Sequence, residues 1–152
     1  MKSEVKVGDN RLQITRVFDA PRHLVFACWK EVDKIHQWWG CKDTNKVECT
    51  MDFRPGGFFT CVMQIIGAGE FTYKAQYDEI VEPERIAYHA DFGPITTRVV
   101  VEFFEQAEQT KMVLTQEGFP TQDVCKMVSR GTTESFDKLD SLLAGQALVN
   151  QR

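Results

Sequence analysis

The stretch NKVECTMDFRPGGFFTCVMQIIG, residues 45–67, is the most informative part of the sequence for the fold class. Two runs rich in aromatic and β-branched residues flank an Arg-Pro-Gly-Gly tetrapeptide at residues 54–57. Proline at the second position of a turn presets its φ, and the glycine after it can adopt the positive φ that a type II turn requires. The stretch therefore predicts a β-hairpin. A phosphate-binding loop also uses glycines, but its lysine and its following helix are missing here.

The chain after this hairpin continues with further strands. In residues 69–92, apolar and aromatic residues alternate with polar ones on both sides of the turn VEPER at 81–85. Residues 95–119 add two more strands around a turn at 105–110. The short connections favour antiparallel pairing, because parallel strands need longer crossovers.

The two ends of the chain have different patterns. RLQITRVF, residues 11–18, predicts a strand with Leu12, Ile14 and Arg16 on one face. Residues 21–40 have helical spacing with a break near 31–33, so we expect two short helices, the second ending at Gly40. After Pro120 an apolar stripe predicts one long helix, composed of Val124, Val128, Phe136, Leu139, Leu142 and Leu143. This order indicates an α+β fold.

Composition predicts a single domain over residues 1–152, with a core of about 11–145. The net charge of −4 and the pI near 5.4 disfavour nucleic acid as a partner. The first ten residues are too polar for a signal peptide, and no apolar run is long enough for a membrane span. We therefore expect a cytoplasmic protein.

The sequence contains five cysteines and no recognisable export signal, which predicts reduced thiols rather than a disulfide framework. None is in a CxxC pair, and the spacings do not resemble a zinc site. Cys41, Cys49 and His36 could share a metal, but small buried side chains are the simpler interpretation. We predict no metal and no cofactor.

Four motifs identify a family resemblance by their order and spacing: RVFDAP at 16–21, QWWG at 37–40, MDFRPGGFF at 51–59 and YDEIVEPERIAY at 77–88. Together they resemble the family named for the activator of heat-shock protein 90 ATPase homologue, in the START-like (Bet v 1-like, SRPBCC) superfamily. The resemblance implies a helix-grip fold. In that fold a curved antiparallel sheet of about seven strands wraps a long C-terminal helix, two short helices follow the first strand, and an elongated apolar cavity lies between sheet and helix.

Two positions depart from what the resemblance implies. Relatives usually have a tryptophan in the long helix where this chain has Thr132, which would leave more space or a polar group facing the cavity. Relatives commonly have proline after WWG, where this chain has Cys41. That change puts a thiol at the expected mouth of the fold.

Trp38 and Trp39 cannot face the same way, because neighbouring side chains diverge on a helix and alternate on a strand. We expect one ring to pack in the core and the other to lie at the cavity mouth, with a ligand contact by one of them as the alternative. Strand alternation and the helix stripe add further residues that are candidates for contact with a ligand. The alternative interpretation is that these residues simply pack in a closed core. The full ligand-binding set is Trp38, Trp39, Phe59, Met63, Phe71, Tyr73, Tyr88, Val99, Met112, Met127 and Thr132.

No catalytic residues are predicted. The three histidines are scattered, and no Ser-His-Asp, GxSxG or HExxH pattern occurs. Alternation places either Tyr88 or His89 inward, so a catalytic role for His89 with Tyr73 or Tyr77 stays open as a minor alternative.

Three functions follow from these observations. The first is a domain that binds a small, largely apolar molecule between the sheet and the long helix, as a monomer or homodimer. The second is a module that assists a chaperone of the heat-shock protein 90 type. Against it, the eukaryotic activator carries an additional N-terminal domain with no counterpart in these 152 residues. The third is a cavity enzyme of cyclase or hydrolase type, for which the sequence offers no convincing acid–base pair.

Overall fold

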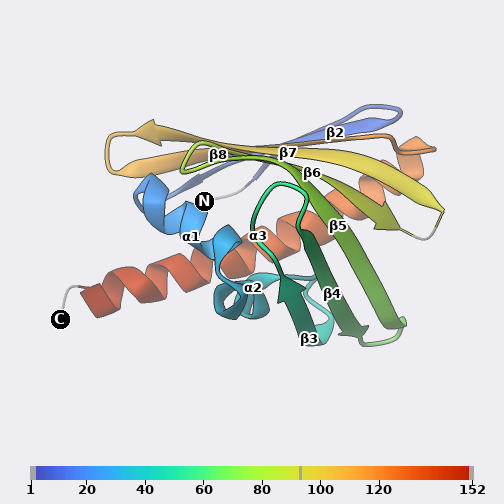
Figure 1. Ribbon diagram of the computed structural model, residues 1–152, viewed down its shortest axis with the longest axis horizontal. Helices are drawn as coiled ribbons and strands as arrows, with labels where there is room; N and C mark the ends of the chain where they lie inside the picture. Colours follow the sequence, from blue (N-terminus) through green and yellow to red (C-terminus); the bar gives the residue numbers. More distant parts are fainter. Residues whose placement is uncertain (1–2, 93, 151–152) are drawn as a thin grey trace.

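A computed structural model describes residues 3–92 and 94–150 and shows one curved antiparallel sheet around a long helix (Figure 1). The strands are β1 (Glu4–Val7), β2 (Arg11–Phe18), β3 (Thr44–Met51), β4 (Phe58–Ile65), β5 (Gly69–Val81), β6 (Arg85–Phe92), β7 (Ile95–Gln106) and β8 (Gln109–Glu117). The helices are α1 (Arg22–Lys30), α2 (Val32–Trp38) and α3 (Gln122–Asn150). The sheet order is β1-β2-β8-β7-β6-β5-β4-β3. The predicted α+β helix-grip fold is confirmed.

The described sheet has eight strands, where the sequence predicted about seven. The additional strand is β1, which pairs with β2 so that Val5 lies opposite Ile14. Its side chains are mostly exposed, so the sequence carries no alternation that could identify it. Its extended form depends on pairing with β2.

The predicted hairpin joins β3 to β4. Gly56 has a φ of +84°, and the backbone N–H of Gly57 donates to the carbonyl of Arg54 at 2.8 Å. A Cβ on Gly57 would lie 2.0 Å from the carbonyl oxygen of Asp52, so only glycine fits there. The predicted positive φ is therefore found at Gly56, and the requirement for glycine at position 57 comes from the close approach of Asp52.

The hairpin corrects one prediction about the cysteines. Cys49 and Cys61 lie directly opposite each other on β3 and β4, with their Cα atoms 4.1 Å apart, and form a disulfide. Reduced thiols were the wrong prediction for this pair, because spacing along the chain says nothing about register. Cys28, Cys41 and Cys125 are free thiols. The disulfide also removes Cys49 from the metal site considered for Cys41 and His36.

The two short helices are separated as predicted. Glu31 is extended, with φ −103° and ψ 121°, and so divides α1 from α2. Helix α2 ends at Trp38, two residues before the predicted Gly40, because Trp39 is already extended. This break turns α2 so that it packs on both α3 and β3.

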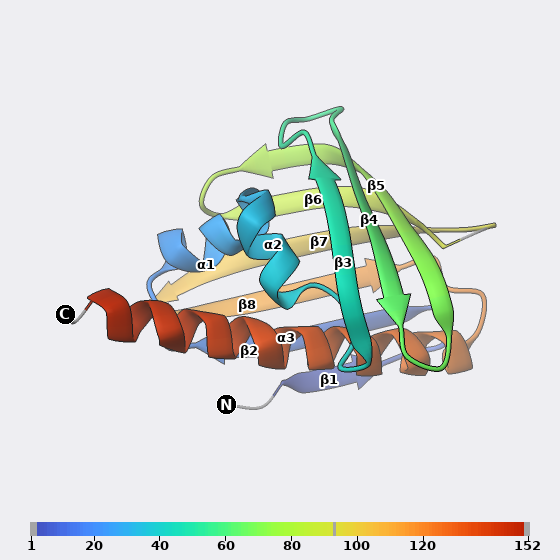
Figure 2. The same cartoon turned by 90° about the horizontal axis from the view of Figure 1, so that it is seen from below.

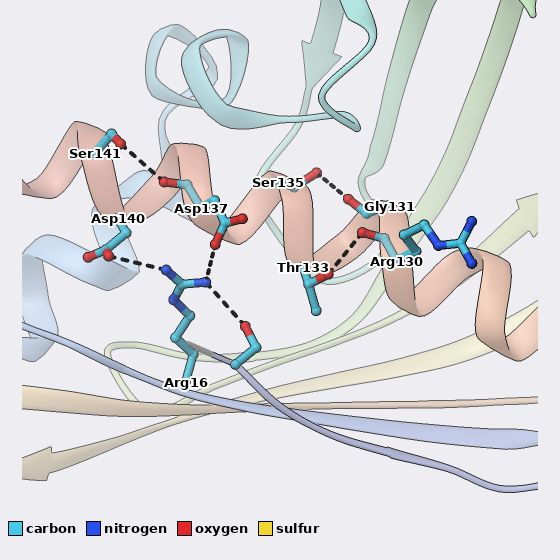
Figure 3. A network of polar contacts seen from close by, with 9 residues as sticks. Arg16, Arg130, Gly131, Thr133, Ser135, Asp137, Asp140 and Ser141 are labelled. Atoms are coloured by element: carbon cyan, nitrogen blue, oxygen red, sulfur yellow. Dashed lines mark hydrogen bonds and ion pairs between the residues drawn. The ribbon is translucent and has the colours of Figure 1, made fainter. Parts of the chain in front are cut away.

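Helix α3 lies across the inner face of the sheet, and the ends of β3, β4 and β5 reach over its N-terminal half (Figure 2). Its predicted stripe is buried at Phe136, Leu139 and Leu143, which face the core. Arg16 is the one charged side chain in the buried core of the described residues, and it reaches from β2 to two aspartates of α3 (Figure 3). Within the described part of the chain, no helix combines the length and apolarity needed to cross a bilayer.

Candidate functional site

A pocket of about 470 Å³ lies between the sheet and the N-terminal half of α3, and we call it the sheet–helix pocket. Its walls come from α1, α2, the segment 39–41, strands β4 to β8 and α3. The lining residues are Trp29, Trp38, Trp39, Gly40, Cys41, Met63, Ile65, Phe71, Tyr73, Tyr88, Ile95, Leu114, Gln116, Val124, Met127, Val128, Gly131, Thr132, Ser135 and Phe136. A second hollow is an open groove between α2 and α3, lined by Gln37 of α2 and by residues of α3 such as Lys138.

The lining of the sheet–helix pocket is apolar and aromatic, and its described residues include no aspartate, glutamate, histidine, lysine or arginine. The remaining polar groups are hydroxyls and one carboxamide. An ionised ligand group inside it would lose its hydration without a counter-charge, which is costly. The pocket is therefore suited to uncharged molecules.

The two tryptophans of the QWWG motif occupy different positions in the wall. Trp38 is 1% exposed, and its indole Nε1–H donates to the carbonyl of Cys28 at 2.9 Å, which fixes the ring in the core. Trp39 is half-buried, and its ring centroid lies 5.1 Å from those of Phe59 and Tyr73 in edge contacts. Both rings border the pocket. The packed ring is Trp38, and Trp39 is the more accessible one.

The segment 39–41 is held against α3 by hydrogen bonds. Gly40 has a φ of +100°, and a Cβ there would lie 2.7 Å from Oγ1 of Thr44, so this sharp exit from α2 requires glycine. Ser135 donates to the carbonyl of Gly40 at 2.7 Å. Lys138 Nζ donates to the carbonyls on either side, those of Trp39 and Cys41. Burial lowers the pKa of Lys138 from its usual value.

The sheet side of the pocket carries two buried tyrosines. The phenol groups of Tyr73 on β5 and Tyr88 on β6 lie close enough to influence each other's pKa. Burial raises the pKa of both phenols far above the usual value, because an ionised phenolate would lose its hydration. Both therefore stay neutral and act as hydrogen-bonding groups rather than as charges.

The hydroxyl groups that α3 contributes to the pocket lining already donate their protons to the backbone, so they have little hydrogen-bonding capacity left for a ligand. Thr132 Oγ1 donates to the carbonyl of Val128, and Ser135 uses its proton on the 39–41 segment. Met127 is 64% exposed and lies with the exposed Phe71 at the open side of the pocket. The polar groups that can still orient a ligand are thus mainly on the sheet side.

The structure brings most of the predicted candidates together around one pocket. Trp38, Trp39, Met63, Phe71, Tyr73, Tyr88, Met127 and Thr132 all line the sheet–helix pocket. Phe59, Val99 and Met112 point to the same face but are enclosed in the core and do not border the pocket. A role for any of them in ligand binding stays a prediction.

Several lining residues escaped sequence reasoning. Leu114 and Gln116 follow Met112 at intervals of two on β8, so extending the alternation would have found them. Val124 and Val128 were predicted in the apolar stripe of the long helix but not in the ligand-binding set, and they share with Ser135 the helical spacing of Met127 and Thr132. Trp29 carried no signal, because its position depends on how α1 packs against α2.

His89 does not join the buried tyrosines. It lies on the outer face of the sheet, is half-exposed, and its Nδ1 is 2.9 Å from Oδ2 of Asp78. Tyr88 is the inward residue of the pair. The minor alternative of catalysis by His89 with Tyr73 or Tyr77 is therefore wrong in geometry, because the residues lie on opposite faces.

Comparison with known proteins gives a family match. Residues 19–144 match the family described as "Activator of Hsp90 ATPase homolog 1-like protein". No curated protein matches the chain at a significant level. The matched range includes both short helices, strands β3 to β8 and most of α3, and so contains the residues that line the sheet–helix pocket.

Solved structures share the fold. A protein from Arthrobacter aurescens superposes with a TM-score of 0.82 at 19% identity, over 95% of this chain and 92% of that one. Protein NE0264 from Nitrosomonas europaea gives 0.78 at 21% identity, over 90% and 96%. A protein from Rhizobium leguminosarum gives 0.75 at 26% identity, over 93% and 98%. These structural similarities support the fold of this chain. They do not identify a ligand for it.

Proposed function

The chain belongs to the family of activator of Hsp90 ATPase homologue 1-like proteins, and we propose that it is a START-like domain that binds a small, largely apolar ligand in the sheet–helix pocket. One observation carries the proposal. A volume of about 470 Å³ falls within the range typical of small-molecule sites, and its walls are apolar apart from a few hydrogen-bonding groups.

The physical basis is the hydrophobic effect. Water in an apolar pocket lacks hydrogen-bonding partners, so an apolar ligand that replaces it gains free energy in proportion to the area removed from water. Aromatic rings such as Trp39 and Tyr73 add contact with ring-shaped ligands. The open side near Phe71 and Met127 provides the route of entry.

A two-dimensional amide NMR titration tests this proposal. The protein is titrated with a panel of lipid, flavonoid-like and steroid-like molecules. We expect saturable shifts confined to the inner face of β4 to β8 and to residues 122–145 of α3. The absence of shifts with every compound well above micromolar concentration would remove support for the proposal.

The titration also separates the alternatives. A chaperone-assisting role is supported only by the family description, and it predicts shifts on the outer surface when a chaperone of the heat-shock protein 90 type is added. A cavity enzyme would need a titratable acid–base pair facing the pocket, and the described lining contains neither a histidine nor a carboxylate. The binding function is therefore the stronger proposal.

A further inference from the structure

Gln116 on β8 is a polar side chain that lines the sheet–helix pocket while being only 4% exposed. Its Nε2 donates to Oγ1 of Thr97 at 2.9 Å. The hydroxyl of Thr97 in turn donates its only proton to the carbonyl of Ala90 at 3.1 Å. The Thr97 oxygen can therefore only accept from Gln116, which fixes the amide with its nitrogen toward Thr97.

The opposite end of the same amide, Oε1, has no hydrogen-bond donor among the described residues. The polar side-chain atoms of this part of the chain that are enclosed without a partner are Arg16 Nε, Arg22 Nε and Trp29 Nε1. Oε1 of Gln116 is not one of them, so it borders open space. Because the side chain is buried and lines the sheet–helix pocket, that space is the pocket. A carbonyl acceptor there is oriented by the rigid Thr97–Ala90 pair.

The chemistry of the ligand group that satisfies this acceptor is restricted. It must donate a hydrogen bond, so an ether or a ketone does not fit. An ammonium would be a buried charge without a described carboxylate in the lining, and an ionised carboxylate offers no proton. An uncharged O–H or N–H donor meets every condition, and of these the hydroxyl is the smallest, so it is the group that we take.

We propose that the sheet–helix pocket selects neutral ligands that carry a hydroxyl group, and that this hydroxyl donates to Oε1 of Gln116. The inference rests on the proposed function, since it names the ligand class of the same pocket. The rest of the ligand contacts the apolar and aromatic walls. An analogue without the donor leaves Oε1 unpaired in a dry site, which weakens binding.

Two probe compounds test the preference. 2-Naphthol and 2-methoxynaphthalene share a neutral aromatic body and an oxygen at the same place, but only 2-naphthol donates a hydrogen bond. Kd is measured for both by NMR titration. We expect wild-type protein to bind 2-naphthol about three- to tenfold more tightly, the effect of one hydrogen bond.

Two variants test whether the preference for 2-naphthol over 2-methoxynaphthalene depends on Gln116. Gln116→Met has a similar shape without the acceptor, and it should bring the Kd ratio close to one. Gln13→Met is the matched control, because Gln13 also donates to a threonine, Thr115, and is only partly buried at a site outside the pocket lining. This control should keep the wild-type ratio.

The outcomes separate the two proposals. Saturable binding of both probes with the same ratio in wild type and Gln116→Met overturns the hydroxyl preference and leaves the binding function standing. A preference for 2-methoxynaphthalene that depends on Gln116 overturns it as well, since the amide would then present its N–H₂. Binding of neither probe, although a compound of the wider panel binds, overturns the hydroxyl preference as stated here and leaves the binding function standing, while absence of binding by every compound removes both proposals. If Gln116→Met does not fold, the side-chain amide signals of Gln116 in wild type decide: 2-naphthol should shift them and 2-methoxynaphthalene should not.

Discussion

Arg16 on β2 and Asp140 on α3 form an ion pair in which Nη2 lies 3.1 Å from Oδ2. Nη1 of the same guanidinium contacts Asp137 one turn earlier (Figure 3). It also donates to the hydroxyl of Ser3. Arg16 occupies an inward position of its strand and is 4% exposed. The pair therefore fixes the C-terminal half of α3 to the sheet, while the pocket lies under the N-terminal half.

Removing the acidic partners of Arg16 should destabilise the fold. In the double variant Asp137→Asn with Asp140→Asn, a buried guanidinium loses two partly exposed counter-charges, and we expect the free energy of unfolding to fall by about 2 kcal/mol. Urea denaturation measures it. Glu117→Gln is the control, because it breaks the exposed Arg11–Glu117 pair and should cost less than about 1 kcal/mol. Equal losses in the two proteins would contradict a buried ion pair at Arg16.

The Cys49–Cys61 disulfide should stabilise the hairpin. The double variant Cys49→Ala with Cys61→Ala frees a short loop in the unfolded chain, and we expect it to lower the free energy of unfolding by about 3 kcal/mol. Thermal unfolding is measured with and without dithiothreitol. The reductant should lower the Tm of the wild-type protein and leave the Tm of the variant unchanged. Thiol titration of the unfolded, unreduced protein should find only Cys28, Cys41 and Cys125. Reactivity of all five cysteines without reductant would rule out the crosslink.

Thr132→Trp should fill part of the sheet–helix pocket. Thr132 lines the pocket and uses its hydroxyl only on the helix backbone, so the larger ring has space to occupy. We expect the variant to keep or gain stability and to lose binding of 2-naphthol. Thr133→Trp, at a neighbouring position that does not line the pocket, should bind as wild type does. A loss of several kcal/mol in Thr132→Trp alone would instead indicate a tightly packed core at this position.

The fold was predictable because its signals are local. The Pro-Gly turn at residues 54–57, strand alternation and the long apolar stripe after Pro120 each reflect backbone geometry that a short window contains. Strand β1 escaped because it has no buried face of its own. The disulfide escaped because it depends on register, although Cys49 and Cys61 are equally far from Pro55.

The sequence could predict which face of the sheet points inward, but not which residues of that face line the pocket. Alternation placed Tyr73 inward and left Tyr88 and His89 as alternatives, and it cannot tell which inward residues border a void, as Met112 shows. Whether a side chain meets another side chain or empty space depends on the curvature of the sheet and the position of α3. The role of Gln116 depends on a chain of hydrogen bonds through Thr97, which no spacing in the sequence reveals.

All three tyrosines of the chain are buried, and burial raises the pKa of Tyr73, Tyr77 and Tyr88 well above the usual value. Burial also raises the pKa of the Cys28 thiol from 9.0 to about 11. In the unfolded chain these groups ionise at their ordinary pKa values, so above that pH the unfolded state binds fewer protons than the folded state. Stability is then lost as pH rises.

The Cys28 thiol and the tyrosines should therefore lower the free energy of unfolding from about pH 9 upward. The fall should continue above about pH 11, because the folded-state pKa of the tyrosines is higher than that of Cys28. Lys138, whose pKa is lowered, opposes only part of this fall. Urea denaturation at a series of pH values measures this. The ultraviolet absorbance of phenolate provides an independent check, since the folded protein at about pH 10 should show almost none, while the unfolded protein shows about half of its tyrosines ionised. Substantial phenolate absorbance in the folded protein at that pH would mean that the tyrosines are solvated, and that the sheet side of the pocket is open to water.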